Sequence, residues 1–240
     1  MNSAHAPQTH LPDKSERHTR LVLVRHGETP WNAEKRFQGH TDIGLNDRGL
    51  QQARSLGAYL RHDTRILQNT NAAYCSDLTR ARLTAEILLD TQLAPVSRTD
   101  LRERDYGHFS GMTAEEMAAH DPAQYQALRD RIPDRAISGG ESLLAFYDRI
   151  KTAMACILND HPGQQVMLVA HGGVLDCVYR MATQTPLQTT RTWLLPNCAL
   201  NILDADHETG ELQIRLWADL NHLKNTEQHN IGDEVDGRVA

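Results

Sequence analysis

The stretch Leu21-Val22-Leu23-Val24-Arg25-His26-Gly27 decides the fold, because its arrangement occurs twice in the chain. The second copy is Val166-Met167-Leu168-Val169-Ala170-His171-Gly172-Gly173. In both, a short apolar run without polar alternation predicts a strand buried on both faces of a parallel sheet. Ligands bind outside the carboxyl ends of such strands, and both runs end in a histidine followed by glycine. Two histidines at that edge of the sheet, one of them beside an arginine, indicate a site for an anion.

Strands and helices alternate along most of the chain. Further strands are expected at about 72–75, 199–203 and 212–217, and apolar spacing predicts helices over about 48–61, 78–88, 141–159 and 174–181. Ser76-Asp77 is expected to cap the second of these helices. The alternation predicts a three-layer α/β/α sandwich with a mostly parallel central sheet. Residues 101–140 depart from it, and we expect two short helices there, near 113–120 and 122–131, in a partial lid over the site.

The length of 240 residues suits one domain, which we place at 19–223. The polar ends, 1–18 and the acidic 224–240, are expected to be flexible tails, and the first carries no apolar core of a secretory signal. The net charge of -6 argues against a nucleic-acid partner or a membrane surface. The last two strands predict a hairpin at the sheet edge, which could pair with a second copy to form a homodimer.

The cysteines and the remaining histidines suggest neither a disulfide framework nor a metal centre. Cys75, Cys156, Cys177 and Cys198 lie far apart without a CxxC pair, so we expect buried thiols in a reducing cytoplasm. The other histidines lack the spacing of metal ligands. We therefore expect no metal and no other cofactor.

The segment Leu23-Val24-Arg25-His26-Gly27-Glu28-Thr29 resembles the signature of the histidine phosphatase superfamily, the phosphoglycerate mutase-like family. Four further blocks follow in that family's order: 76–85, 101–107, Gly140-Glu141-Ser142 with Arg149, and Ala170-His171-Gly172-Gly173. The resemblance covers roughly residues 20–223. A lone Arg-His-Gly would be weak evidence, whereas five ordered blocks are specific. The resemblance implies the phosphoglycerate mutase-like fold and phosphoryl transfer.

The resemblance assigns His26 as the nucleophile. An imidazole attacks phosphorus only when neutral, so one ring nitrogen needs an acceptor, and a backbone carbonyl beside Gly27 can serve. Arg25 and Arg80 are expected to clamp the phosphoryl oxygens, because guanidinium groups match phosphate geometry. Arg80 also lies in the first turn of its helix, where amide groups favour anions. His171 is expected to stabilise the transferring group as an imidazolium.

Glu103 is the expected general acid, which protonates the leaving oxygen and then activates water. Partial burial and the charge of the phosphate would keep it protonated near neutral pH. Glu28, Asp105 and Glu141 remain alternatives. The resemblance also implies phosphate contact at Asn32 and substrate contacts at Gln38, Gly39, Thr41 and Gly172.

The choice between phosphatase and mutase depends on additional cations. Mutases of the family resemble one another in a long insertion after the acid block, with a lysine and paired arginines. Here the segment 107–140 is shorter and lacks lysine, and its Arg129, Arg131 and Arg135 sit among Asp130 and Asp134. The loop His40-Thr41-Asp42 also lacks the tryptophan usual in those mutases.

These features favour a metal-independent phosphatase that hydrolyses small phosphorylated metabolites through a phosphohistidine on His26. A phosphoglycerate mutase is the alternative. A non-catalytic phosphate-binding protein is a further one, although the chain retains all five core residues.

Overall fold

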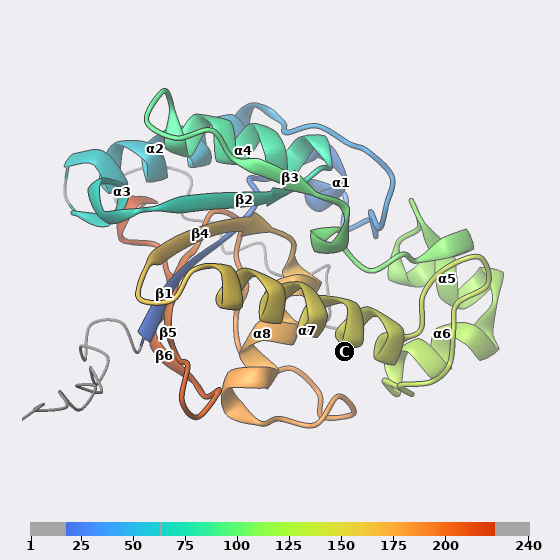
Figure 1. The fold of residues 1–240 in the computed structure, drawn as a ribbon. Helices are drawn as coiled ribbons and strands as arrows, with labels where there is room; N and C mark the ends of the chain where they lie inside the picture. Colours follow the sequence, from blue (N-terminus) through green and yellow to red (C-terminus); the bar gives the residue numbers. More distant parts are fainter. Residues whose placement is uncertain (1–17, 63, 224–240) are drawn as a thin grey trace, which may run out of the picture.

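A computed structural model describes residues 18–62 and 64–223 of the chain. The tails predicted at the two ends lie outside the described residues, apart from His18, which begins the first strand. The centre is a six-stranded sheet in the order β3-β2-β4-β1-β5-β6 (Figure 1). Its strands are β1 (His18–Arg25), β2 (Ala72–Ser76), β3 (Val96–Arg98), β4 (Gln165–Ala170), β5 (Leu200–Asp206) and β6 (Leu212–Asp219).

The register of β1 against β4 positions the two histidines. These strands run parallel, with Arg25 opposite Ala170. The residues that follow, His26 and His171, therefore leave the sheet side by side at its carboxyl edge. β2 and β3 continue the parallel part, whereas β5 and β6 run antiparallel as an edge hairpin. The predicted mostly parallel sheet with a terminal hairpin is confirmed.

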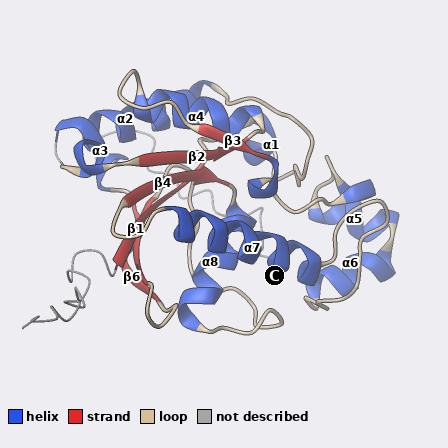
Figure 2. Cartoon of the chain, in the orientation of Figure 1, coloured by secondary structure: helices blue, strands red, loops and turns tan. Residues whose placement is uncertain are grey.

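Helices cover both faces of the sheet (Figures 1 and 2). On one face α2 (Asp47–His62) and α4 (Thr79–Leu89) form a core with Val22 and Val24 of β1. On the other, α7 (Leu143–Asp160) and α8 (Gly172–Thr183) pack with Leu21 and Leu23. Alternate residues of β1 thus enter different cores, which is why the strand is apolar throughout. The predicted three-layer sandwich and its four main helices are confirmed.

The remaining helices are short. They are α1 (Pro30–Ala33), α3 (Ile66–Asn69), α5 (Ala114–His120), α6 (Pro122–Arg129) and the 3-10 turns η2 (Thr99–Leu101), η3 (Gly107–Phe109) and η4 (Asn221–Leu223). α5 and α6 are the two predicted helices of the lid, and Figure 1 shows them beyond the carboxyl end of β2. Phe37, Phe109 and Met117 share a small separate core there. α1, α3 and β3 were not predicted, because three or four residues show no clear period.

The start of α4 differs from the prediction. Leu78 is its N-cap residue and makes no side-chain cap, so the expected cap by Ser76-Asp77 is wrong. Instead, the carboxylate of Asp42 accepts hydrogen bonds from the amide of Thr79 at 2.7 Å and from its hydroxyl at 2.8 Å. The loop 38–42 is thereby fastened to the first turn of α4. Asp77 instead pairs with Arg102.

Arg131 also differs from the sequence-based interpretation. The sequence places it beside Asp130, but its guanidinium turns inward to Asp176 of α8, with 3.2 Å between Nη2 and Oδ2. Its Nε donates to the carbonyl of Leu187 at 2.7 Å. These contacts attach the end of the segment 101–140 to α8 and to the loop that follows it.

Cys75, Cys177 and Cys198 are buried, as expected. The expectation of burial is wrong for Cys156, whose side chain is exposed on α7. None of the helices within 18–62 and 64–223 has both the length and the apolar character needed to cross a membrane.

Candidate active site

His26 is held from three directions at the end of β1. Its amide donates to the carbonyl of Ala170 at 2.9 Å, and the side chain of Asn197 donates to its carbonyl at 2.8 Å. The ring nitrogen Nδ1 lies 2.7 Å from the carbonyl oxygen of Gly27. Because a carbonyl oxygen only accepts, Nδ1 carries the proton and Nε2 carries the lone pair. This is the tautomer that a nucleophilic histidine requires, held by the backbone acceptor that the sequence predicts.

His171 faces His26 from the start of α8. The two ring centroids are 5.2 Å apart, and the rings meet edge to face. The side chain of His171 is completely buried, yet neither ring nitrogen makes a hydrogen bond with any residue in the described part of the chain. Buried polar atoms in proteins almost always have a hydrogen-bond partner. The two nitrogens therefore indicate a polar ligand between the histidines.

Arg25 and Arg80 are both buried beside this pair. Arg80 donates from Nη2 to the carbonyl of Gly39 at 2.8 Å and from Nη1 to that of Thr41 at 2.9 Å. Arg25 donates from Nη1 to the carbonyl of Leu195 at 2.5 Å. The loop carbonyls orient the two guanidinium groups. Gly39 and Thr41, predicted as substrate contacts, thus act on Arg80 through their main chain.

The protein's own groups keep both histidines neutral. Burial lowers the pKa of His26 well below its ordinary value, and the positive charges of Arg80 and Arg25 lower it further. Burial and Arg80 lower the pKa of His171 in the same way. The imidazolium expected for His171 is therefore not favoured by the surrounding residues. It would need the negative charge of a bound phosphate.

Glu103 is buried next to the start of α8. Its Oε2 accepts a hydrogen bond from the amide of Gly173 at 2.9 Å, and its Oε1 accepts one from the amide of Arg104 at 2.8 Å. Gly173 permits this approach, because a Cβ there would lie 2.2 Å from Oε1. Two backbone amides thus fix the carboxylate of Glu103, and one of them belongs to Gly173, two residues after His171.

The other candidate carboxylates are taken up by structural contacts. Oε2 of Glu28 lies 3.4 Å from Nη1 of Arg48, and Oδ2 of Asp105 lies 3.6 Å from Nδ1 of His40. Glu141 forms an ion pair with Arg149 at 2.7 Å. Burial opposes ionisation of Glu141, but hydrogen bonds from Arg149 and the amide of Asp105 outweigh it and hold its pKa below the ordinary value. These contacts favour Glu103 as the acid.

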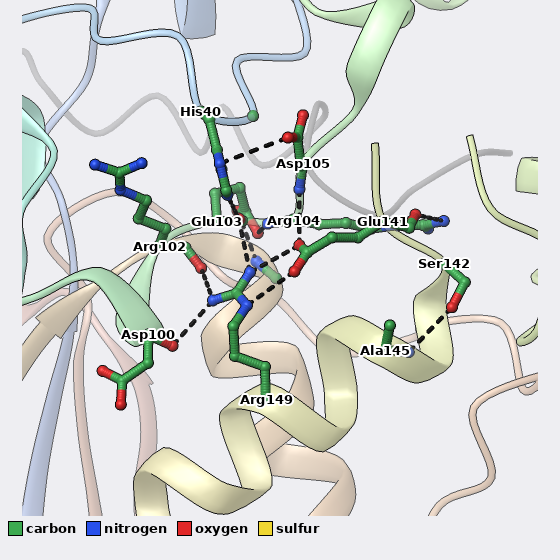
Figure 3. A network of polar contacts seen from close by, with 12 residues as sticks. His40, Asp100, Arg102, Glu103, Arg104, Asp105, Glu141, Ser142, Ala145 and Arg149 are labelled. Atoms are coloured by element: carbon green, nitrogen blue, oxygen red, sulfur yellow. Dashed lines mark hydrogen bonds and ion pairs between the residues drawn. The ribbon is translucent and has the colours of Figure 1, made fainter. Parts of the chain in front are cut away.

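The segment that carries Glu103 is held by a network that sequence reasoning did not identify (Figure 3). Arg149 of α7 donates to three carbonyls of this segment, at 2.9 Å to Asp100, 2.9 Å to Arg102 and 3.2 Å to Glu103. Arg149 was recognised only as part of a sequence block. Its acceptors lie more than forty residues away in the chain, so spacing carried no signal of them.

Asn32 and Gln38 provide further donors. The side-chain oxygen of Asn32 accepts from the amide of Thr29 at 3.1 Å, and that of Gln38 accepts from the hydroxyl of Thr29 at 3.0 Å. The amide nitrogens of both side chains are buried without a hydrogen bond to any described residue. Gly172 is the first residue of α8, where backbone amides favour anions. The three residues therefore suit phosphate contacts.

Together, the residues form a candidate site for an anion, built around a neutral histidine. The chain belongs to the histidine phosphatase superfamily, branch 1, whose pattern matches residues 21–219. Membership agrees with the order of the sequence blocks and with the fold.

Two relatives from Arabidopsis thaliana show this kinship. Phosphoglycerate mutase-like protein 4 is 36% identical over 209 residues, which cover 86% of this chain and 87% of the relative. A metal-independent phosphoserine phosphatase is 36% identical over 210 residues, covering 86% and 84%. Among solved structures, YhfR of Bacillus stearothermophilus superimposes with a TM-score of 0.77 at 31% identity, covering 86% of this chain and 100% of that chain.

The two buried histidines predict a pH dependence of stability. Because their pKa values are lowered in the folded protein, the unfolded chain binds more protons below about pH 6.5, the ordinary histidine value. The free energy of unfolding should therefore fall as the pH drops from 7 to 5, measured by urea denaturation. The variant His26→Ala should show a shallower fall. Identical slopes for the wild type and His26→Ala would contradict the lowered pKa of His26.

The contact between Gly173 and Glu103 predicts a catalytic defect. In Gly173→Ala the added Cβ displaces the carboxylate, so kcat should fall by about 100-fold, the lower end of what a general acid contributes. Gly44→Ala is the matched control, because a Cβ there meets nothing within 4 Å. An unchanged kcat in Gly173→Ala would contradict the assignment of Glu103 as the general acid.

Proposed function

We propose that the protein is a metal-independent phosphatase that hydrolyses small phosphomonoesters through a phosphohistidine on His26. The observation that carries this proposal is the hydrogen bond from Nδ1 of His26 to the carbonyl of Gly27. Because this bond places the ring proton on Nδ1, the lone pair lies on Nε2, which can act as the nucleophile. His171 lies beside it, and neither of its ring nitrogens makes a hydrogen bond with a described residue. Arg25 and Arg80 supply the positive charge that a phosphate dianion needs.

In the first step, the ester phosphate binds between the two arginines and His171. The lone pair of His26 Nε2 attacks phosphorus, and the bond to the leaving oxygen breaks. Protonated Glu103 gives its proton to that oxygen, so the alcohol leaves neutral. The arginines stabilise the charge on the equatorial oxygens in the transition state.

In the second step, water hydrolyses the phosphohistidine. The Glu103 carboxylate takes a proton from water as its oxygen attacks phosphorus, and the bond from phosphorus to Nε2 breaks. Inorganic phosphate leaves, and both side chains return to their starting states. The tautomer of His26 is retained throughout, because the carbonyl of Gly27 still holds Nδ1.

The contacts of the lid arginines support hydrolysis over mutase activity. A mutase needs further cations for a second anionic group of the substrate. Arg131 is engaged by Asp176 and the carbonyl of Leu187, and Arg129 and Arg135 are exposed. The phosphatase name of one Arabidopsis relative points the same way. The unpaired cysteines support a cytoplasmic location.

The proposal is tested by phosphate release from a panel of phosphorylated metabolites in the presence of EDTA. Wild-type protein should release phosphate, and His26→Ala should lose about 10⁴-fold or more in kcat, as other enzymes do without their nucleophile. A far-UV circular dichroism spectrum that matches the wild type checks that His26→Ala is folded. Loss of activity with EDTA, or full activity of His26→Ala, would refute the proposal. Conversion of 3-phosphoglycerate to 2-phosphoglycerate without phosphate release would make the protein a mutase.

A further inference from the structure

The loop 38–42 lies between the phosphate clamp and the acid. Its main chain holds Arg80, because the carbonyls of Gly39 and Thr41 each accept a hydrogen bond from a different nitrogen of that guanidinium. The residue between these two carbonyls is His40. Sequence reasoning gave His40 no role beyond the absence of metal-ligand spacing.

The side chain of His40 points toward the segment that carries Glu103 (Figure 3). Its Nε2 lies 2.9 Å from the main-chain carbonyl of Glu103, and its Nδ1 lies 3.6 Å from the carboxylate of Asp105. Because the carbonyl only accepts, Nε2 carries a proton and donates it. His40 is thus hydrogen bonded to the acid segment through its side chain. The carbonyls of the residues on either side of it accept hydrogen bonds from Arg80.

Close packing leaves this loop little room to move. Gly39 has φ of +52°, and a Cβ there would lie 3.1 Å from the amide nitrogen of Tyr106 and 3.3 Å from the carbonyl of Arg104. On the opposite side, Asp42 binds the amide and hydroxyl of Thr79. The loop is therefore wedged between the first turn of α4 and the acid segment.

We infer that His40 is a positioning residue that couples the Arg80 clamp to the acid Glu103, an inference that rests on the proposed function. Proton transfer to the leaving oxygen requires a separation of about 2.6–3.2 Å, and a misplacement of about 1 Å can cost 100-fold in rate. Arg80 sets the position of the phosphate, and Glu103 must meet the oxygen attached to it. The hydrogen bond from His40 to the carbonyl of Glu103 joins the loop that holds Arg80 to the segment that carries the acid.

Other contacts keep the acid segment folded without His40. Arg149 also donates to the carbonyl of Glu103, at 3.2 Å, and Arg102 pairs with Asp77. These two contacts attach the acid segment to α7 and to the residues before α4. Neither contact involves the loop 38–42, which holds Arg80. Removal of the imidazole should therefore shift the acid relative to the phosphate and leave the fold intact.

The test compares two esters that differ in their need for an acid. An alkyl phosphate requires protonation of its leaving oxygen, whereas p-nitrophenyl phosphate releases a stable anion. The readout is kcat/KM, which reports the phosphorylation step and excludes the hydrolysis of the phosphohistidine that both esters share. In His40→Ala, kcat/KM for the alkyl ester should fall about 10- to 100-fold, and kcat/KM for p-nitrophenyl phosphate should fall at least several-fold less. In His40→Gln, whose amide can donate to the same carbonyl, most of the alkyl activity should return.

His108→Ala is the matched control. His108 also bonds a main-chain carbonyl, with Nδ1 3.2 Å from Ser138, but it takes no part in the site. This variant should keep wild-type rates on both esters. Equal losses on the two esters in His40→Ala, failure of His40→Gln to recover, or wild-type rates in His40→Ala would each overturn the inference. Failure of the proposed function would instead appear as no phosphate release by the wild type, or as full activity of His26→Ala.

Discussion

The hydrogen bond between Nδ1 of His26 and the carbonyl of Gly27 is the interaction on which the site depends. It assigns the ring proton to Nδ1 and so leaves the lone pair on Nε2, the atom that the proposed reaction requires as its nucleophile. The bond forms only because the chain turns directly after β1. That turn is held by the carbonyl of Ala170 on β4 and by the side chain of Asn197. The parallel pairing of β1 with β4 therefore matters for the reaction, because it determines the orientation of the His26 ring.

Burial imposes the second constraint. His26 and His171 are neutral because they are buried near Arg80 and Arg25, and the buried guanidinium groups are oriented by loop carbonyls. Buried polar atoms that make no hydrogen bond, such as the ring nitrogens of His171 among the described residues, are unfavourable. A phosphate dianion would accept a hydrogen bond from His171 and would lie beside the two arginines. The acidic protein thus places two buried arginines where the proposed phosphate would bind.

Much of the fold and of the candidate site could be predicted from the sequence. The two strand–His–Gly segments carry local signals, and the parallel register then brings His26 and His171 together. Contacts between distant segments could not be predicted in this way. Asp42 at the start of α4, Arg131 on Asp176 and His40 on Glu103 each join residues between 37 and 63 positions apart, which no spacing rule connects. Such contacts depend on how the loops pack, and packing is decided by the whole fold.

The most direct test of this account is to trap the phosphorylated protein during turnover and to locate the phosphoryl group by mass spectrometry and ³¹P NMR. The two nitrogen isomers of phosphohistidine differ in chemical shift, so the spectrum identifies the attacking atom. The account predicts phosphorylation of His26 at Nε2, because the carbonyl of Gly27 occupies Nδ1. A phosphoryl group on Nδ1, or on a different residue, would contradict it.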